Sequence, residues 1–344
     1  MTKNIGIYLG IIGLLIICLV GAIGAVAYQH FKGPLAPKLE MVTQVTPTEA
    51  ETISLPESNA VIVTSTPLPT SAPTATTPAV YTCGETGTVN LLVMQRDVKF
   101  WVPPYGADSI RLVRVDFDHQ KAVVFTLQRD LWLNTPSLKG KYNIDGERLG
   151  TIYALVLQHE VNNPEADAKA ISAVAQTIYD NFNVAPQQYI TLKENTLRDV
   201  IDAIGGIEVD IPAAVSREDL RLNAGKQILN GNTAQLYARF MHYTIQEWDR
   251  LDRQNLILES LLAKLKDPAT ILKVPSLLNQ FQKNIVTDLS PAQLTDLACM
   301  AEKISSNNIT FKTIALQDVS IRADGSIYIN DLQKIQYLLK DLGF

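Results

Sequence analysis

The sequence lacks the features of several common protein classes. No segment of about 20–50 residues repeats, which argues against a repeat architecture, and no Gly-rich loop of the kind that cradles nucleotide phosphates is present. Acidic residues outnumber basic ones, 35 against 30, so the formal net charge is −5. A chain without an excess of positive charge has little overall attraction for nucleic acid, and we expect no nucleic-acid partner.

Charge is also absent from residues 5–27. Because a helix of roughly 20 apolar residues can cross a bilayer, we expect a transmembrane anchor at 5–28 after a cytoplasmic tail at 1–4. Lys3 and Lys32 flank the run with only a weak charge bias, and the short tail favours the cytoplasmic side. The remainder of this cell-membrane protein would then be extracytoplasmic. The alternative is a signal peptide cleaved near the small residues 25–27.

Residues 29–82 have the composition of a disordered linker. They are rich in Thr, Pro and Ser, as in TSTPLPTSAPTATTP, and nearly free of aromatic residues, so they cannot build a core. The coil from Pro34 to Thr82, about 49 residues, extends on the order of 40 Å, which would let a tethered domain work near the membrane. Residues 83–344 have the size and composition of one globular domain.

Strand and helix patterns alternate within this domain. The mixed order predicts an α/β (mixed α+β) fold, a single domain whose central mixed β-sheet is flanked by helices. Strands are expected at 89–94, 109–116, 121–127, 188–192, 207–211 and 310–316. Helices are expected at 144–159, 166–182, 194–204, 233–240, 249–266, 271–282, 291–304 and 331–342.

A cationic stretch, LYARFMHYTIQEWDRLDRQ, is the most informative part of the chain. Arg239, His242, Arg250 and Arg253 lie within fifteen positions, and arginine forks match phosphate oxygens in pairs. Arg250 and Gln254 are four apart, so a helix would place them on one face. The alternative is a solvated charged face neutralised by nearby aspartates.

Two further regions favour an anion site. Asp97 and Asp108 lie at strand ends, where carboxylates and substrate phosphates together hold Mg²⁺. Arg129 ends another strand, and Lys141 follows in KGKYN. Carboxylates that hold a metal, with cations that hold phosphate, are the parts that phosphoryl transfer requires.

The order of these motifs resembles the LytR–CpsA–Psr (LCP) family of cell-envelope glycopolymer transferases. The resemblance covers roughly residues 89–265 and includes the expected anchor. It rests on MQRD at Asp97, GADSI at Asp108, LQRD at Arg129, KYN at 141–143, VIDAIGGIEVDIP at 200–212, LNGNTAQLYARFMH at 229–242 and DRLDRQ at 249–254.

The resemblance implies a phosphotransferase that uses Mg²⁺. Such an enzyme moves a glycan with its phosphate from a polyprenyl-pyrophosphate carrier to a hydroxyl of peptidoglycan or another wall glycan, and the prenyl chain occupies an apolar tunnel. Asp97 and Asp108 would hold the metal. The pyrophosphate would be held by Arg129, Lys141, Arg239, Arg250, Arg253 and Gln254.

Three positions depart from the family pattern. Gly106 and Met241 stand where the family has arginine, and Gln95 replaces a glycine. Arg96, Arg111 or His242 could supply the missing charge. The competing hypothesis is therefore a non-catalytic, membrane-anchored protein that binds polyprenyl phosphate or lipid-linked glycan as a scaffold or regulator.

Cys83 and Cys299 are the only cysteines beyond the expected anchor. Since an exported domain folds in an environment that permits disulfides, we predict a bond between them. The alternative is two buried free thiols, because cysteine packs well as a small apolar residue.

Overall fold

The computed structural model describes residues 33–42, 83–96, 106–240, 247–271 and 273–344. The predicted anchor at 5–28 lies outside these ranges, as do Asp97, Met241 and His242. Within the described ranges, no helix is both long enough and apolar enough to cross a membrane.

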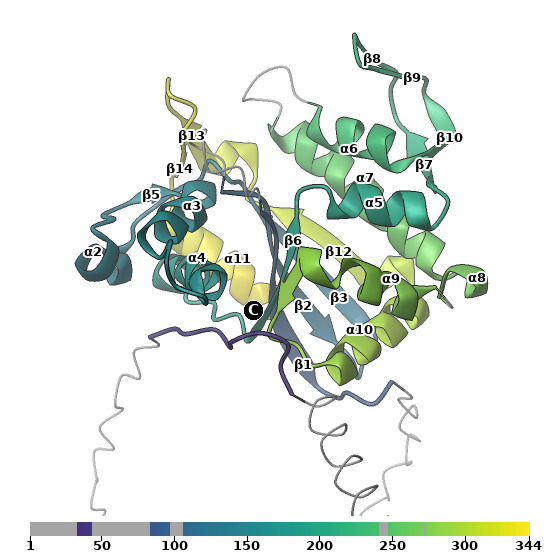
Figure 1. Ribbon diagram of the computed structural model, residues 1–344. Coiled ribbons are helices and arrows are strands. Elements are labelled where there is room, and N and C mark those ends of the chain that lie inside the picture. Colours follow the sequence, from purple (N-terminus) through teal and green to yellow (C-terminus); the bar gives the residue numbers. More distant parts are fainter. Residues whose placement is uncertain (1–32, 43–82, 97–105, 241–246, 272) are drawn as a thin grey trace, which may run out of the picture.

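A mixed sheet divides the domain into two helical layers (Figure 1). In the described part of the chain it has six strands, in the order β11-β6-β1-β2-β3-β12. The β1–β6 and β3–β12 pairs are parallel, whereas β1–β2, β2–β3 and β6–β11 are antiparallel. The strands are β1 (Thr88–Arg96), β2 (Ala107–Asp116), β3 (Lys121–Leu127), β6 (Gln188–Lys193), β11 (Ile285–Thr287) and β12 (Ile309–Thr313).

One layer, on the left in Figure 1, covers the first face of the sheet. Its core joins Leu92, Met94, Ile110 and Leu112 of the sheet to apolar residues of α3, α4 and α11. Residues 92, 94, 110 and 112 alternate along their strands, as the two-residue period of a strand requires. The elements here are β4 (Trp132–Leu133), α2 (Pro136–Tyr142), β5 (Glu147–Arg148), α3 (Leu149–His159), α4 (Ala166–Phe182), β13 (Val319–Ile321), β14 (Ile327–Ile329) and α11 (Leu332–Asp341).

The second layer, on the right in Figure 1, lies over the other face. A separate core forms beneath α5, α6 and α7 with the β7–β10 pair. The elements are α5 (Thr196–Ala203), β7 (Ile207–Ile211), β8 (Val215–Arg217), β9 (Leu220–Leu222), β10 (Gly225–Leu229), α6 (Gly231–Arg239), α7 (Glu247–Leu265), α8 (Pro268–Ile271), α9 (Val274–Phe281) and α10 (Pro291–Lys303).

The predicted fold class is confirmed, and most predicted elements are found within a few residues of their expected bounds. One helix prediction is wrong at its start. The helix expected at 144–159 begins only at Leu149, after the short strand β5, whereas the helix expected at 271–282 corresponds to α9 (Val274–Phe281). The short strands β8, β9 and β10 and the helix α2 were not predicted, because short elements carry too few residues to show a period.

Part of the expected disordered linker is ordered. Residues 33–42 lie along the lower end of the domain in Figure 1 and make hydrogen bonds to α4, β6 and Leu289, two positions before α10. The linker prediction therefore fails for this segment, because Ala36, Leu39 and Met41 are apolar and pack against the core.

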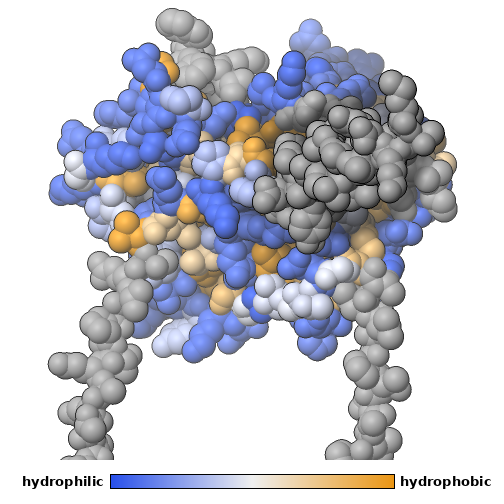
Figure 2. Space-filling model, turned by 60° about the horizontal axis from the view of Figure 1, so that its bottom comes forward, coloured by the Kyte–Doolittle hydropathy of each residue, from blue (hydrophilic) through white to orange (hydrophobic). Residues whose placement is uncertain are grey.

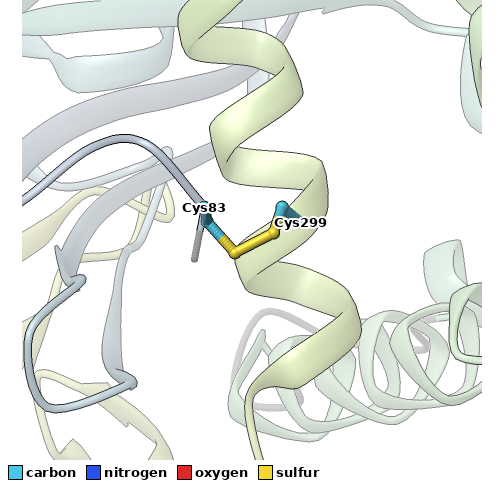
Figure 3. The surroundings of a disulfide bond; sticks show 2 residues. All are labelled: Cys83 and Cys299. Carbon is cyan, nitrogen blue, oxygen red and sulfur yellow. A yellow bond between two sulfur atoms is a disulfide. The ribbon is translucent and has the colours of Figure 1, made fainter. Parts of the chain in front are cut away.

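The predicted disulfide is confirmed. Cys83 bonds to Cys299, with their Cα atoms 5.6 Å apart (Figure 3). Cys83 is buried at the start of the domain, and Cys299 lies on α10. The bond thus joins the chain before β1 to a helix 216 residues later.

Removing this bond should destabilise the domain. In the chain-entropy model a closed loop of this length contributes about 4–5 kcal/mol. We expect the double variant Cys83→Ser/Cys299→Ser, or the reduced wild-type chain, to melt at a clearly lower temperature than the oxidised chain. The double variant itself should not respond to reductant. Equal melting temperatures with and without reductant for the wild-type chain would contradict a stabilising role.

Candidate functional site

An apolar cavity with one charged end lies between the sheet and the second helical layer. Its volume is about 270 Å³. Strands β1, β2, β3, β6 and β12 form one wall, and α6 and α7 form much of the other. The apolar part is lined by Val93, Val113, Val124, Leu192, Leu197, Ala238, Ile257, Leu258, Leu261, Leu262 and Phe311.

The charged end of the cavity lies at a bulge in β2. Gln95 of β1 pairs with Ser109, but the next residue, Arg96, pairs with Ala107, so Asp108 is the extra residue. A bulge redirects side chains that would otherwise alternate. Asp108 and Ser109 accordingly both line the cavity, although they are neighbours in the chain.

Three arginines surround Asp108. Arg129, which follows β3, donates a hydrogen bond to its Oδ1. One terminal guanidinium nitrogen of Arg250 lies 3.6 Å from the same oxygen, and Nε of Arg239 lies 3.8 Å from Oδ2. Burial alone would raise the pKa of Asp108, but the charges of Arg250, Arg129 and Arg239 outweigh it and hold the pKa below its usual value. The carboxyl group is therefore ionised at neutral pH.

Acidic residues accompany each of these arginines. Glu247 accepts two hydrogen bonds from Arg250, at 2.5 and 2.7 Å, and both side chains are buried. Glu194 accepts a hydrogen bond from Arg239. Asp130 lies 3.4 Å from Nε of Arg129. The buried pair at the start of α7 fixes the Arg250 fork, while one of its terminal nitrogens has no hydrogen-bond partner in the described structure.

Arg111 is a further arginine of the site. The sequence indicates it only as a possible replacement for a missing family arginine. It lies three residues after Asp108 on the cavity side of β2 and is 4% exposed. Its guanidinium donates to Gln254 at 3.0 Å, and to Asn255 and Thr126 at 2.8 Å. Burial and the charge of Arg250 lower the pKa of Arg111 to about 10, so it stays protonated at neutral pH. We refer to Arg111, Arg129, Arg239 and Arg250 as the arginine cluster.

Gln254 is placed as the sequence predicted, on the same face of α7 as Arg250. Both side chains are buried, and Gln254 lines the cavity. Its Oε1 accepts the hydrogen bond from Arg111. Gln254 therefore helps to orient a cation at the point where the charged end meets the apolar part.

Two predicted phosphate ligands do not join the cluster. Lys141 lies on α2 in the opposite helical layer (Figure 1), where it pairs with Glu160 at 3.3 Å. Arg253 lies on α7 but turns toward Phe240, donating to its carbonyl oxygen and stacking 5.2 Å from its ring centre. Arg253 directly precedes Gln254, so its side chain lies roughly 100° around the helix axis from that of Gln254.

Arg96 is also excluded as a substitute for a missing family arginine. It follows Gln95, so its side chain points to the opposite face of the sheet. There it is buried and pairs with Asp167 of α4 at 3.0 Å. Arg96 thus belongs to the core beneath α4 and not to the cavity.

Close packing against α3 explains why position 106 is a glycine. A Cβ at Gly106 would lie 2.6 Å from the carbonyl oxygen of Gly150 and 2.7 Å from the backbone nitrogen of Ala154, both in α3. Gly150 is equally tight against the Ala107 carbonyl oxygen, at 2.6 Å. The two glycines let α3 approach the start of β2, and the larger residue of the family pattern has no room here.

Two carboxylates of the described residues line the cavity, Asp108 and Glu194, and Glu194 accepts a hydrogen bond from Arg239. Mg²⁺ is usually held by one or two carboxylates, waters and substrate phosphates, and Asp108 is ionised and lines the cavity. No group of three or more His, Cys, Asp or Glu side chains arranged for a metal occurs among the described residues. A cation would therefore need phosphate oxygens, or Asp97, as further ligands.

The fold and the site together define a protein that can hold an amphiphile, with its anionic group at the arginines and its apolar part along the cavity. The chain matches the LytR_cpsA_psr family over residues 60–342 and belongs to that family.

Named relatives agree with this assignment. The chain is 23% identical to the regulatory protein MsrR of Staphylococcus aureus, over 70% of this chain and 69% of MsrR. It is 22% identical to TagV of Bacillus subtilis, named a polyisoprenyl-teichoic acid–peptidoglycan teichoic acid transferase, over 48% of this chain and 46% of TagV.

Solved structures share the fold. The crystal structure of B. subtilis TagV superposes with a TM-score of 0.58 at 19% identity, covering 75% of this chain and 97% of that one. The structure of TagT bound to LI-WTA has a TM-score of 0.53 at 15% identity, covering 76% and 92% of the two chains.

Restoring the family arginine at position 106 should damage the protein. Because a Cβ there meets backbone atoms of α3, we expect Gly106→Ala to destabilise the domain by about 1–3 kcal/mol, and Gly106→Arg by at least as much. Gly140→Ala is the matched control, since nothing lies within 4 Å of the added Cβ and the site is helical. Denaturant unfolding of the three variants would measure this. An unchanged midpoint for Gly106→Arg would show that α3 is not packed as described.

Proposed function

We propose that this chain is a Mg²⁺-dependent phosphotransferase that moves a glycopolymer from a polyprenyl-pyrophosphate carrier onto a hydroxyl group of a cell-wall glycan, at an extracytoplasmic site. The observation that carries the proposal is the cavity, which is apolar along its length and has the arginine cluster at one end. A lipid diphosphate likewise consists of a long apolar chain with an anionic group at one end. The curated name of the TagV relative and the LI-WTA ligand of TagT support this substrate class.

In the proposed transfer the glycan keeps the phosphate to which it is attached. The acceptor oxygen attacks the phosphorus that carries the glycan, the bond from that phosphorus to the bridging oxygen breaks, and polyprenyl monophosphate leaves. The hydroxyl proton is released as the new phosphodiester forms. Negative charge grows on the bridging oxygen and on the transferred group, where arginine forks stabilise it best.

The residues divide this work by position. Arg250 has a buried guanidinium nitrogen without a hydrogen-bond partner in the described structure, so it can donate to a phosphate oxygen without losing its bond to Glu247. Arg239 is the most exposed of the cluster, at 38%, and can move toward substrate. Arg111, fixed by Gln254, would hold the phosphate nearer the apolar part.

The charge balance argues for a metal in this proposal. The four arginines of the cluster face four carboxylates, Asp108, Asp130, Glu194 and Glu247. A diphosphate added to this balanced set brings uncompensated negative charge into a partly buried site. Mg²⁺ held by Asp108, with Asp97 as the expected second ligand, would neutralise the phosphates and make the leaving group better.

The same balance also favours the competing hypothesis. With each arginine already partnered, binding without turnover is the outcome if no metal enters, and MsrR is named as a regulatory protein. The full-length chain should be incubated with a labelled lipid-linked glycan and peptidoglycan, with Mg²⁺ or with a chelator. We expect labelled peptidoglycan only with Mg²⁺. Clear lipid binding without product in either condition would instead establish the non-catalytic binder.

Substitution of Asp108 should separate the two hypotheses further. In Asp108→Asn the charge that would hold the metal is lost, while the side chain keeps its size. We expect transfer to fall by at least about a hundredfold, whereas binding of the lipid diphosphate without metal should hold or rise because an anion has been removed. A variant that transfers at the wild-type rate would show that Asp108 serves only to organise the arginines.

Arg111 provides a test of the cavity geometry. A phosphate contact with a charged donor is worth about 1.5–3 kcal/mol, so Arg111→Met should weaken binding of a polyprenyl diphosphate roughly ten- to hundredfold. Lys141→Met is the matched control, because Lys141 pairs with Glu160 outside the cluster. Circular dichroism would check that both variants are folded. Equal losses in the two variants would contradict the assignment of the cavity end as the phosphate site.

A further inference from the structure

A short segment of the chain crosses the domain on a side away from the arginine cluster, level with the middle of β1. We call residues 33–42 the N-terminal strap; they run along the lower end of the domain in Figure 1. Tyr189 of β6, which contacts the strap, pairs with Leu92 of β1. Leu92 lies four residues before Arg96, so this contact lies about 13 Å along the strand from the bulge at Asp108.

The first half of the strap is held by the edge of the sheet. The backbone nitrogen of Leu35 donates to the carbonyl oxygen of Leu289 at 3.3 Å. The hydroxyl group of Tyr189 donates to the carbonyl oxygen of Pro37 at 2.9 Å. Tyr189 is fully buried, so its hydroxyl group would lose its described partner if the strap left.

The second half is held by α4. The backbone nitrogen of Glu40 donates to Ser172 at 3.0 Å, and that of Val42 donates to Oε1 of Gln176 at 2.7 Å. The amide nitrogen of Gln176 donates back to the carbonyl oxygen of Val42 at 3.3 Å. The backbone N–H and C=O groups of Val42 thus both bond to the side-chain amide of Gln176, as they would to a neighbouring strand.

Apolar side chains fix the register of the strap. Ala36, Leu39 and Met41 are partly buried and pack against the same core that joins the sheet to α3 and α4. Leu35 and Val42 point outward, at 50% and 72% exposed. The strap therefore has an inner and an outer side, as a docked segment has and a passing coil does not. From below, the coloured part of the visible surface is mostly hydrophilic, with small apolar areas (Figure 2).

We propose that the groove formed by α4, β6 and Leu289 is a docking surface for the chain's own residues 33–42, and that this strap keeps the end of the preceding apolar run within about 22 Å of this side of the domain. Residues 43–82 then form a loop closed at both ends, by the strap and by the Cys83–Cys299 bond. On this proposal, residues 43–82 do not set the distance between the expected anchor and the domain.

A docked strap limits the distance between the domain and the apolar run. Five residues lie between Ala27, the end of the uncharged run, and Gly33, so the two Cα atoms are at most about 22 Å apart when the chain is fully extended. A free coil through 29–82 would allow the domain to lie on the order of 40 Å away. The strap thus replaces a long, variable separation with a short one and fixes which end of the sheet faces the apolar run.

Hydrogen exchange on the full-length protein tests the strap directly. We expect the amides of residues 33–42 to exchange at least about tenfold more slowly than in Leu39→Asp, which places a charge against the core. Val42→Asp is the matched control, since it adds the same charge at an exposed position, and it should exchange like the wild type. Unprotected amides in the wild-type chain would overturn the proposal.

A cut in the loop gives a second measurement without substrate or metal, so that its failure is distinct from a failure of the proposed transfer. A protease site inserted after Thr70 would separate the strap from the domain, and the disulfide lies entirely on the domain side. With an N-terminal tag, we expect the domain to stay on the resin for the wild type and Val42→Asp, and to elute for Leu39→Asp. Tyr189→Phe, which keeps the ring, should shorten retention. Immediate elution of the wild-type domain, or equal retention of Leu39→Asp and Val42→Asp, would refute the strap.

Discussion

The site depends on the convergence of Arg129, Arg239 and Arg250 on the single carboxylate of Asp108. These three cations come from the end of a strand, the last turn of one helix and the first turn of another. Without an anion between them they would repel one another across a partly buried space. Asp108 therefore organises the mouth of the cavity before any substrate arrives, and the lowered pKa of its carboxyl group is the expression of that role.

Backbone geometry determines which charges reach the cavity. The β2 bulge brings Asp108 to the same side as Ser109, and the regular alternation that follows brings Arg111 there as well. The same alternation on β1 sends Arg96 to the other face, where Asp167 neutralises it. The close approach of Gly106 and Gly150 lets the backbone around Arg129 lie beside the start of β2, since Gly150 donates its N–H to the Arg129 carbonyl oxygen at 2.8 Å. A glycine that looks like a lost arginine in the sequence is therefore a packing requirement in the structure.

The sequence was most informative where long periodic patterns coincide with family motifs. The main strands β1, β2 and β3 and the helix α4 follow from their patterns, as does the pairing of Arg250 with Gln254 on one face of α7. The bulge could not be predicted, because it is a register shift between two strands and neither strand reveals it alone. Lys141 was misplaced because the motif KYN fixes an order along the chain, whereas α2 carries it to the far helical layer. The strap was missed because its neighbours are rich in Thr, Pro and Ser, and the alternation of its apolar residues spans too few positions to stand out.

The two ends of the sheet carry different features, and the cavity lies between one face of the sheet and the helices α6 and α7. At one end the arginine cluster can bind an anion; at the other, the strap brings the N-terminal side of the chain to the domain.

If the apolar run of residues 5–27 lies in a bilayer, the strap directs the lower end of the sheet toward that bilayer. An apolar chain lying along Val93, Val113 and Leu261 would then extend from the arginines toward the membrane side. A lipid diphosphate could keep its tail covered by protein while its phosphates reach the charged end, which removes the cost of exposing a long hydrocarbon chain to water. On these proposals, the orientation that the strap would impose is the one that a lipid-linked substrate requires.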